Sequence, residues 1–131
     1  MRVLLTCLLL GLAAPALAED ARMQSTITRQ LEALQRDDYP AAFDFASPNI
    51  KGIFGSPENF GRMVREGYPM VHRPSAVKML EARDVDGALW QRVLITDAEG
   101  RSHLLDYQMV ETAEGWQINA VQLLKATGTG A

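Results

Sequence analysis

The second half of the sequence constrains the fold most, because it consists of apolar runs that are separated by short clusters of turn residues. The four runs cover residues 76–85, 88–96, 102–110 and 116–124. The clusters between them are Asp86-Gly87, residues 97–100 and residues 112–115. Such short clusters have the composition of hairpin turns, which join neighbouring antiparallel strands. The pattern therefore predicts an antiparallel meander of four strands.

Two helices are predicted in the first part of the chain, before residue 47. Apolar residues recur at helical spacing between Met23 and Asp37, with charged side chains between them. A shorter helix is predicted from Tyr39 to Ala46, because Asp38 can serve as its N-cap. The Ser47-Pro48 pair that follows is typical of a turn.

A third helix is predicted after Ser56, which can serve as an N-cap, with Pro57 in the first turn and Gly67 at the end. Its apolar stripe is expected to face inward and consists of Phe60, Met63 and Val64. Residues 68–74 contain two prolines, each of which forces the preceding residue out of the helical conformation. This segment is therefore expected to form an extended strap without helix.

The first residues predict export. Arg2 precedes an apolar run from Val3 to Leu12, and Ala16-Leu17-Ala18 fits a cleavage site for a signal peptide. The run is shorter than the ~20 apolar residues that a membrane-spanning helix requires. Residues 1–18 are therefore predicted to be a cleaved signal peptide, and the mature protein to be periplasmic or secreted. The single cysteine, Cys7, would leave with this peptide, so no disulfide is expected.

Charge and length limit the possible partners and the number of domains. The chain has 131 residues, with 13 basic and 16 acidic side chains and a formal net charge of −3. The basic residues form no stripe, so neither a nucleic acid nor a membrane surface is expected as a partner after signal cleavage. One domain is predicted over residues 19–126, followed by a disordered tail over residues 127–131.

Turn lengths set the strand register and so assign side chains to the two faces of the sheet. If the turns close as written, one face carries an aliphatic row made of Leu80, Val93, Leu104 and Leu123. The other end of this face is polar and carries Gln91, Asp106, Gln108 and Asn119. Helices that leave the polar end uncovered would create a pocket with a polar floor.

The opposite face is predicted to be a partner surface, because it mixes aromatic and aliphatic side chains with a few charges. Its members are Trp90, Arg92, Leu105, Tyr107, Met109, Trp116 and Ile118. Side chains alternate between the faces along a strand, so a slip of one residue would exchange the two roles.

Several segments resemble a bacterial family of unknown function within the nuclear transport factor 2-like superfamily. They are residues 47–50, 54–57, 68–74 and the Gly115-Trp116-Gln117-Ile118 sequence. The resemblance implies an α+β fold in which N-terminal helices pack on a curved four-stranded antiparallel sheet to form a cone. The superfamily includes isomerases, dehydratases, ligand-binding proteins and adaptors that dimerise through the outer sheet face.

Asp106 is the candidate with the most catalytic potential, because a carboxylate among apolar side chains can act as a general base. The alternative is a structural carboxylate that is hydrogen-bonded to Gln91 and to loop amides.

Tyr68, His72 and Arg73 are further candidates, at the mouth of the predicted pocket. An imidazole there could exchange protons and a guanidinium could bind a carboxylate, or both could simply cap loop carbonyls. The histidines lack neighbouring histidine or cysteine residues in the sequence, so no transition-metal site is expected. No other cofactor is predicted.

Three function hypotheses follow. The first is a domain that binds a small, partly apolar molecule in the cone. The second is an enzyme of the isomerase or dehydratase type, with Asp106 as the base. The third is a dimeric adaptor that uses the outer sheet face.

Overall fold

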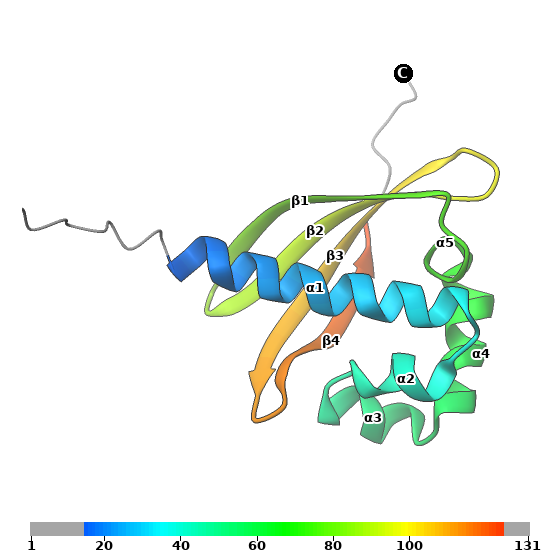
Figure 1. The fold of residues 1–131 in the computed structure, drawn as a ribbon, viewed down its shortest axis with the longest axis horizontal. Helices are drawn as coiled ribbons and strands as arrows, with labels where there is room; N and C mark the ends of the chain where they lie inside the picture. The colour runs from blue at the N-terminus through cyan, green and yellow to red at the C-terminus, as the bar shows by residue number, and fades with distance from the viewer. Residues whose placement is uncertain (1–14, 125–131) are drawn as a thin grey trace, which may run out of the picture.

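The computed structural model describes residues 15–124, which form helices followed by a single antiparallel sheet (Figure 1). The helices are α1 (Pro15–Gln35), α2 (Tyr39–Asp44), α3 (Pro48–Phe54), α4 (Pro57–Gly67) and α5 (Pro69–His72). The strands are β1 (Ala76–Val85), β2 (Ala88–Thr96), β3 (Ser102–Thr112) and β4 (Gly115–Leu123). The four strands are arranged in sequence order, which confirms the predicted α+β class and the meander.

The helices occupy one face and one end of the sheet. Helix α1 crosses in front of the strands, while α2 to α5 gather beyond one end of them (Figure 1). Among the described helices, none combines the length and the apolar character that crossing a membrane would require. Helix α1 begins eight residues before the predicted Met23, and residues 1–14 of the predicted signal peptide lie outside the described residues.

Side-chain caps explain where three helices begin. Asp38, Ser47 and Ser56 each accept a hydrogen bond from a backbone amide in the first turn of α2, α3 and α4. Two of these caps were predicted. Helix α3 was not, because Ser47-Pro48 was interpreted as a turn although it has the same Ser-Pro pattern that correctly predicted α4 at Ser56.

The segment after α4 differs from the predicted strap. Residues 69–72 form one helical turn, α5, in which Met70 and Val71 are buried. The restriction that proline places on its predecessor still holds, because Tyr68 and Arg73 both have non-helical backbone angles. Since Pro69 is tolerated in a first turn, a single turn fits between the two prolines.

The β2–β3 loop corrects the predicted register. Thr96 pairs with Ser102, so the loop contains Asp97 to Arg101 and is one residue longer than predicted. The Asp97 side chain accepts hydrogen bonds from the backbone amides of Glu99 and Arg101, both at 2.9 Å. These bonds stabilise the longer loop, and they shift β3 by one residue against β2, so that Asp106 pairs with Arg92.

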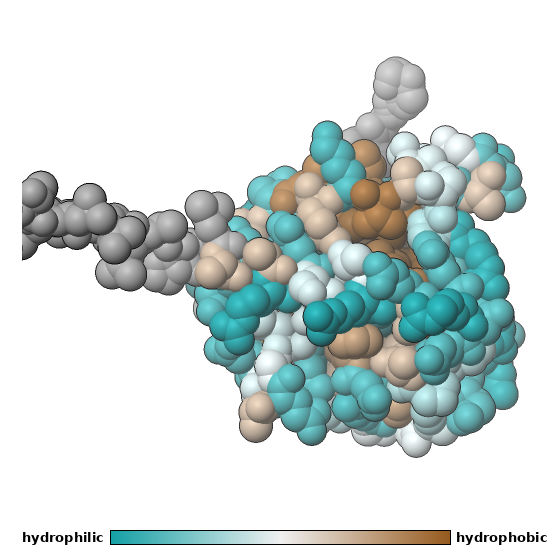
Figure 2. Space-filling model, in the orientation of Figure 1, coloured by the Kyte–Doolittle hydropathy of each residue, from teal (hydrophilic) through white to brown (hydrophobic). Residues whose placement is uncertain are grey.

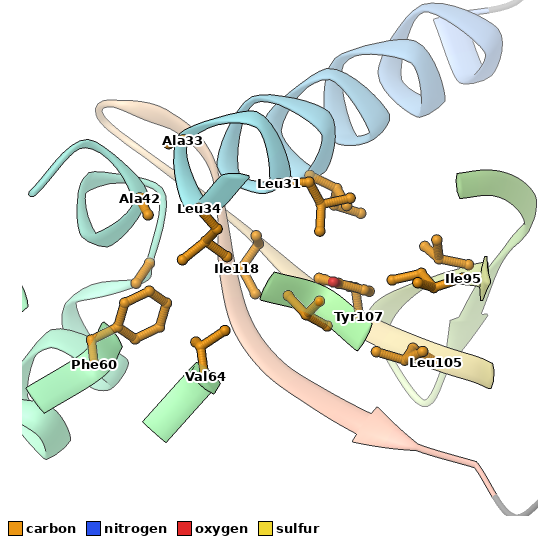
Figure 3. Packing of buried hydrophobic residues seen from close by; sticks show 14 of the residues in the cluster. Leu31, Ala33, Leu34, Ala42, Phe60, Val64, Ile95, Leu105, Tyr107 and Ile118 are labelled. Atoms are coloured by element: carbon orange, nitrogen blue, oxygen red, sulfur yellow. The ribbon is translucent and has the colours of Figure 1, made fainter. Parts of the chain in front are cut away.

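This shift exchanges the faces of β3. Leu105, Tyr107 and Met109 point toward the helices and are at most 2% exposed, whereas Asp106 lies on the opposite face. The prediction that Asp106 faces inward and Tyr107 outward was therefore wrong. Figure 3 shows Tyr107 and Leu105 packed among Leu31, Ile95 and Ile118.

A β-bulge in β4 aligns that strand with the shifted β3. Met109 pairs with Ile118, but Gln108 pairs with Ala120, so Asn119 is the extra residue. Next to the bulge, Ser47 donates its backbone N–H to the carbonyl oxygen of Ile118 at 2.8 Å. This contact holds the α2–α3 connection against the edge of β4.

The surface over α1 is mostly hydrophilic, with an apolar area beside it where the strands are less covered (Figure 2). Val77 on β1 is one of the large apolar side chains that remain exposed, at 39%. The helices thus cover the sheet incompletely.

Candidate ligand cavity

A cavity of about 470 Å³ lies between helices α3 and α4 and the end of the sheet formed by β3 and β4. Helix α3 contributes Ile50, Ile53 and Phe54, and α4 contributes the predicted stripe of Phe60, Met63 and Val64. The walls are therefore mainly aliphatic and aromatic. The expectation that the stripe of α4 faces inward is confirmed, since Phe60 and Val64 are buried and Met63 is half-buried.

The wall formed by α3 is lightly anchored. None of its seven residues is buried, and Ile53 is 64% exposed. The helix begins at the Ser47 cap and ends at Gly55, which has the left-handed φ of 79° that glycine adopts without strain. Two short connections thus hold α3 over the cavity.

Three polar side chains that line the cavity already have hydrogen-bond partners within the protein. Gln30 donates to the carbonyl oxygen of Ala42 at 3.1 Å, and Tyr68 donates to the carbonyl oxygen of Val121 at 3.5 Å. Asn119 accepts from the Ser47 hydroxyl at 2.8 Å and donates to Gln108 at 2.9 Å. These bonds fix the orientation of the polar groups in the wall.

The Tyr107 hydroxyl differs from these groups. Tyr107 borders the cavity and is fully buried, and its hydroxyl has no hydrogen-bond partner among the described residues. Burial, with a smaller effect from nearby Tyr68, raises the pKa of Tyr107 above its ordinary value. The group therefore stays protonated at neutral pH and is available as a donor.

The structure brings only some of the predicted pocket residues together. Tyr68 and Asn119 line the cavity. Gln91 does face the helices, but it is fully buried away from the cavity. Its side-chain amide donates to the carbonyl oxygen of Leu80 at 3.0 Å, within the irregular part of β1 between Met79 and Ala82. Gln91 therefore supports a strand irregularity.

Asp106 and Gln108 do not line the cavity. Asp106 accepts hydrogen bonds from Arg83 at 2.6 Å and 3.2 Å, and Arg92 contacts it at 3.5 Å. The carboxylate raises the pKa of Arg83. On this face of the sheet the carboxylate forms an ion-pair cluster, and it is not directed at the space under α4.

His72 and Arg73 also lie away from the cavity, on Asp37 at the end of α1. His72 contacts the Asp37 carboxylate at 2.7 Å, and Arg73 donates to both of its oxygens at 2.9 Å and 3.0 Å. The hydrogen bonds from His72 and then Arg73 lower the pKa of Asp37 to about 2. The pair therefore connects α5 to α1.

Only part of the predicted partner surface lies on the face of the sheet opposite the helices. Trp90 and Arg92 lie on the face opposite the helices and are half-buried. The register shift and the bulge place the other strand residues in the core: Leu105, Tyr107, Met109 and Ile118. Trp116 packs against the core from the edge and donates from its indole N–H to Glu19 at 2.9 Å.

The cavity residues that sequence reasoning missed include Ile50, Ile53, Phe54 and Tyr107. For the first three, the signal was present in the Ser47-Pro48 pair, which marks the start of a helix. For Tyr107, the signal was Asp97, whose side chain can bond the amides of a longer loop. Among residues 15–124 there is no group of three or more side chains suited to holding a metal ion.

Comparison with known protein families identifies the family to which the chain belongs. Residues 16–131 match the family described as Domain of unknown function (DUF4864), which covers all but the first part of the sequence. The protein belongs to this family, whose description states no activity. Comparisons with curated proteins and with solved structures returned no match.

Proposed function

We propose that this protein binds a small, neutral and largely apolar molecule in the cavity between α3, α4 and the sheet. The observation that carries the proposal is a cavity of about 470 Å³ whose lining residues include no charged side chain. Ligand sites commonly have about 300–1,000 Å³ and apolar walls with a few placed polar groups. A charged ligand would have to leave water without a counter-ion here, which is unfavourable.

The lining supports binding over catalysis. It includes no carboxylate, imidazole or thiol that could act as a general base or nucleophile. Asp106, the base of the enzyme hypothesis, is engaged by Arg83 and Arg92 on the other face of the sheet. The resemblance to cone-shaped ligand-binding proteins of the nuclear transport factor 2-like superfamily agrees with this proposal, since here too helices enclose one end of the sheet.

Filling the cavity tests the proposal. Val121 lines the cavity, whereas Leu123 lies two residues along the same strand, outside the lining, and is 48% exposed. We expect the neutral fluorescent probe N-phenyl-1-naphthylamine to bind the native protein and Leu123→Phe alike. Val121→Phe should bind at least about tenfold more weakly, because the added ring occupies the space.

Two results would contradict the proposal. One is equal probe binding by Val121→Phe and the native protein, with circular dichroism showing that both are folded. The other is that no neutral compound from a broad metabolite set raises the melting temperature of the native protein, while Val121→Phe itself raises it. The cavity would then be a packing defect of the core and not a ligand site.

We also propose that the protein is exported and cleaved after Ala18. The support is the charged, apolar and small-residue order of residues 2–18. A mature chain that starts at Glu19 keeps the Glu19–Trp116 hydrogen bond of 2.9 Å. Intact mass spectrometry of the protein recovered from a periplasmic extract should give residues 19–131, and recovery of the uncleaved chain from the cytosol would contradict export.

We further propose that two copies associate through the sheet face opposite the helices. Trp90 and Leu94 are half-buried there, beside the ion-pair cluster of Arg83, Arg92 and Asp106, in which the carboxylate is buried and the arginines are partly exposed. Light scattering should give a dimer for the native protein and a monomer for Trp90→Arg, because the new charge would be desolvated in the interface. A native monomer, or a Trp90→Arg dimer, would end this proposal.

A further inference from the structure

Tyr107 bears a hydroxyl whose position is not explained by packing. It is one of two buried side-chain polar atoms without a partner among the described residues, and the other, Arg92 Nε, does not border the cavity. A buried hydroxyl without a partner destabilises the folded state, because it has lost its hydrogen bonds to water. A phenylalanine would fill the same space without that penalty. The hydroxyl therefore points to a partner other than the residues that the structure describes.

We propose that the Tyr107 hydroxyl donates a hydrogen bond to a neutral acceptor oxygen of the ligand, such as that of a ketone or an ester. This inference rests on the proposed function and specifies its ligand class. Tyr107 thereby becomes the specificity-determining residue of the cavity.

The surroundings of the hydroxyl favour this assignment. Figure 3 shows the Tyr107 oxygen on the side of Ile118 and Val64, which both line the cavity. Gln30 and Tyr68, which also line the cavity, donate to backbone carbonyls, and neither is a hydrogen-bond partner of the Tyr107 hydroxyl in the described structure. The hydroxyl is closed to water in this structure, so an acceptor in the cavity that Tyr107 borders reaches it when neighbouring side chains shift.

The same surroundings disfavour an anionic acceptor. No lysine, arginine or histidine is among the lining residues, so a carboxylate would be buried without a counter-ion. Burial keeps the Tyr107 hydroxyl protonated, and it offers one proton to the ligand. The ligand then has its acceptor at the deep end and its apolar part along α3, toward the exposed Ile53.

Three probes with one carbon skeleton test this inference: butylbenzene, butyrophenone and 4-phenylbutyrate. Their affinities are measured by displacement of N-phenyl-1-naphthylamine from the native protein, from Tyr107→Phe and from Tyr68→Phe. Tyr68→Phe is the matched control, because it removes a cavity hydroxyl that already has a partner, the carbonyl oxygen of Val121 at 3.5 Å.

We expect the native protein to prefer the ketone over the hydrocarbon by about two- to tenfold, and to bind the carboxylate most weakly. Tyr107→Phe should bind the two neutral probes equally, with the affinity for butylbenzene unchanged and with a melting temperature at or above that of the native protein. Tyr68→Phe should keep the native preference.

The other outcomes separate this inference from the proposed function. If the native protein binds all neutral probes without preference, or if Tyr107→Phe keeps the preference, the cavity is a ligand site and the role of Tyr107 is overturned. A preference that disappears in Tyr68→Phe overturns it as well. If neither the dye nor any probe binds to the native protein, the proposed function fails together with this inference.

Discussion

At the scale of single residues, Asp37 shows how one carboxylate holds two distant segments together. It follows α1 and has a left-handed φ of 57°, which aspartate and asparagine tolerate better than most residues. Besides His72 and Arg73, it accepts a hydrogen bond from the Tyr39 hydroxyl at 3.2 Å. Donors from α2, α5 and the residue after α5 thus converge on the end of α1.

This convergence predicts a specific loss of stability in acid. The folded protein holds the pKa of Asp37 at about 2, below the ordinary value of 3.8. A lowered pKa stabilises the folded state fully above about pH 4, and this contribution is lost as the pH falls from about 4 toward 2. We expect Asp37→Asn to lower the melting temperature at pH 7, and the difference from the native protein to shrink toward pH 2.

Asp86→Asn is the control for this measurement, because Asp86 also has a left-handed φ, of 53°, and forms none of the described ion pairs. Its melting temperature should follow that of the native protein at every pH. A difference between Asp37→Asn and the native protein that stays constant from pH 7 to pH 2 would refute the electrostatic explanation.

Asp106 provides a second prediction at this scale. Its side chain is 5% exposed and its arginine partners are about a third exposed or less. Replacing one member of such a cluster leaves the other charges without compensation. Asp106→Asn should therefore lower the free energy of unfolding by about 1–3 kcal/mol in urea titrations.

Glu81→Gln is the matched comparison, because Glu81 also pairs with Arg92 but is 53% exposed. Glu81→Gln should lower the free energy of unfolding by less than about 1 kcal/mol. If both variants lose the same free energy of unfolding, the burial of Asp106 does not add to the contribution of its ion pairs to stability.

At the scale of elements, the contact between α2 and α4 depends on the absence of a side chain at Gly61. A Cβ atom there would lie 2.5 Å from Cδ1 of the Tyr39 ring. That ring cannot move away freely, since the Arg65 guanidinium lies 5.1 Å from its centroid and Asp37 accepts from its hydroxyl. Gly61 thus sets how closely the two helices approach.

Gly61→Ala is therefore expected to destabilise the fold by about 1–3 kcal/mol in spite of the higher helix propensity of alanine. Gly67→Ala, at the end of the same helix, has no atom within 4 Å of the added carbon and should be neutral or stabilising by up to about 1 kcal/mol. Thermal or urea unfolding of both variants gives the comparison, and a stabilised Gly61→Ala would show that Tyr39 can move.

The elements also show what the sequence could and could not predict. Helix starts at Asp38 and Ser56 were predictable, because a cap and its helix lie within a few residues of each other. The faces of β3 were not, because they depend on whether the loop after Thr96 has four or five residues. The loop length, which two hydrogen bonds of Asp97 stabilise, thus determines which face of the sheet each side chain of β3 occupies.

At the scale of the whole molecule, the cavity combines segments that are far apart in the sequence. Its walls come from α3, α4 and the Tyr68–Val71 region on one side and from β3 and β4 on the other. The sequence predicted the inward stripe of α4, but the polar floor depended on strand register and was assigned to the wrong residues, Asp106 and Gln108. An apolar cavity with a single unpartnered hydroxyl could be recognised only once that register was known.

Stability should be distributed unevenly over this molecule, because its segments differ in burial. Val93 and Leu105 are fully buried in the middle of the sheet, whereas α3 has no buried residue. Segments with few buried contacts open locally at a free energy below that of global unfolding. In hydrogen-exchange mass spectrometry, the amides of α3 should therefore exchange well before those of β2 and β3.

Ligand binding should slow hydrogen exchange first in the segments that line the cavity. A molecule that binds only when α3 is closed stabilises that state by an amount that grows with its concentration, about 2.7 kcal/mol at a hundred times its Kd. With N-phenyl-1-naphthylamine present, the exchange of α3 and of the Tyr68–Val71 region should therefore slow by up to about a hundredfold. Val121→Phe, which lacks the space for the probe, should show no such slowing. Exchange that slows equally in β1, whose residues do not line the cavity, would mean that the probe binds elsewhere or stabilises the fold as a whole.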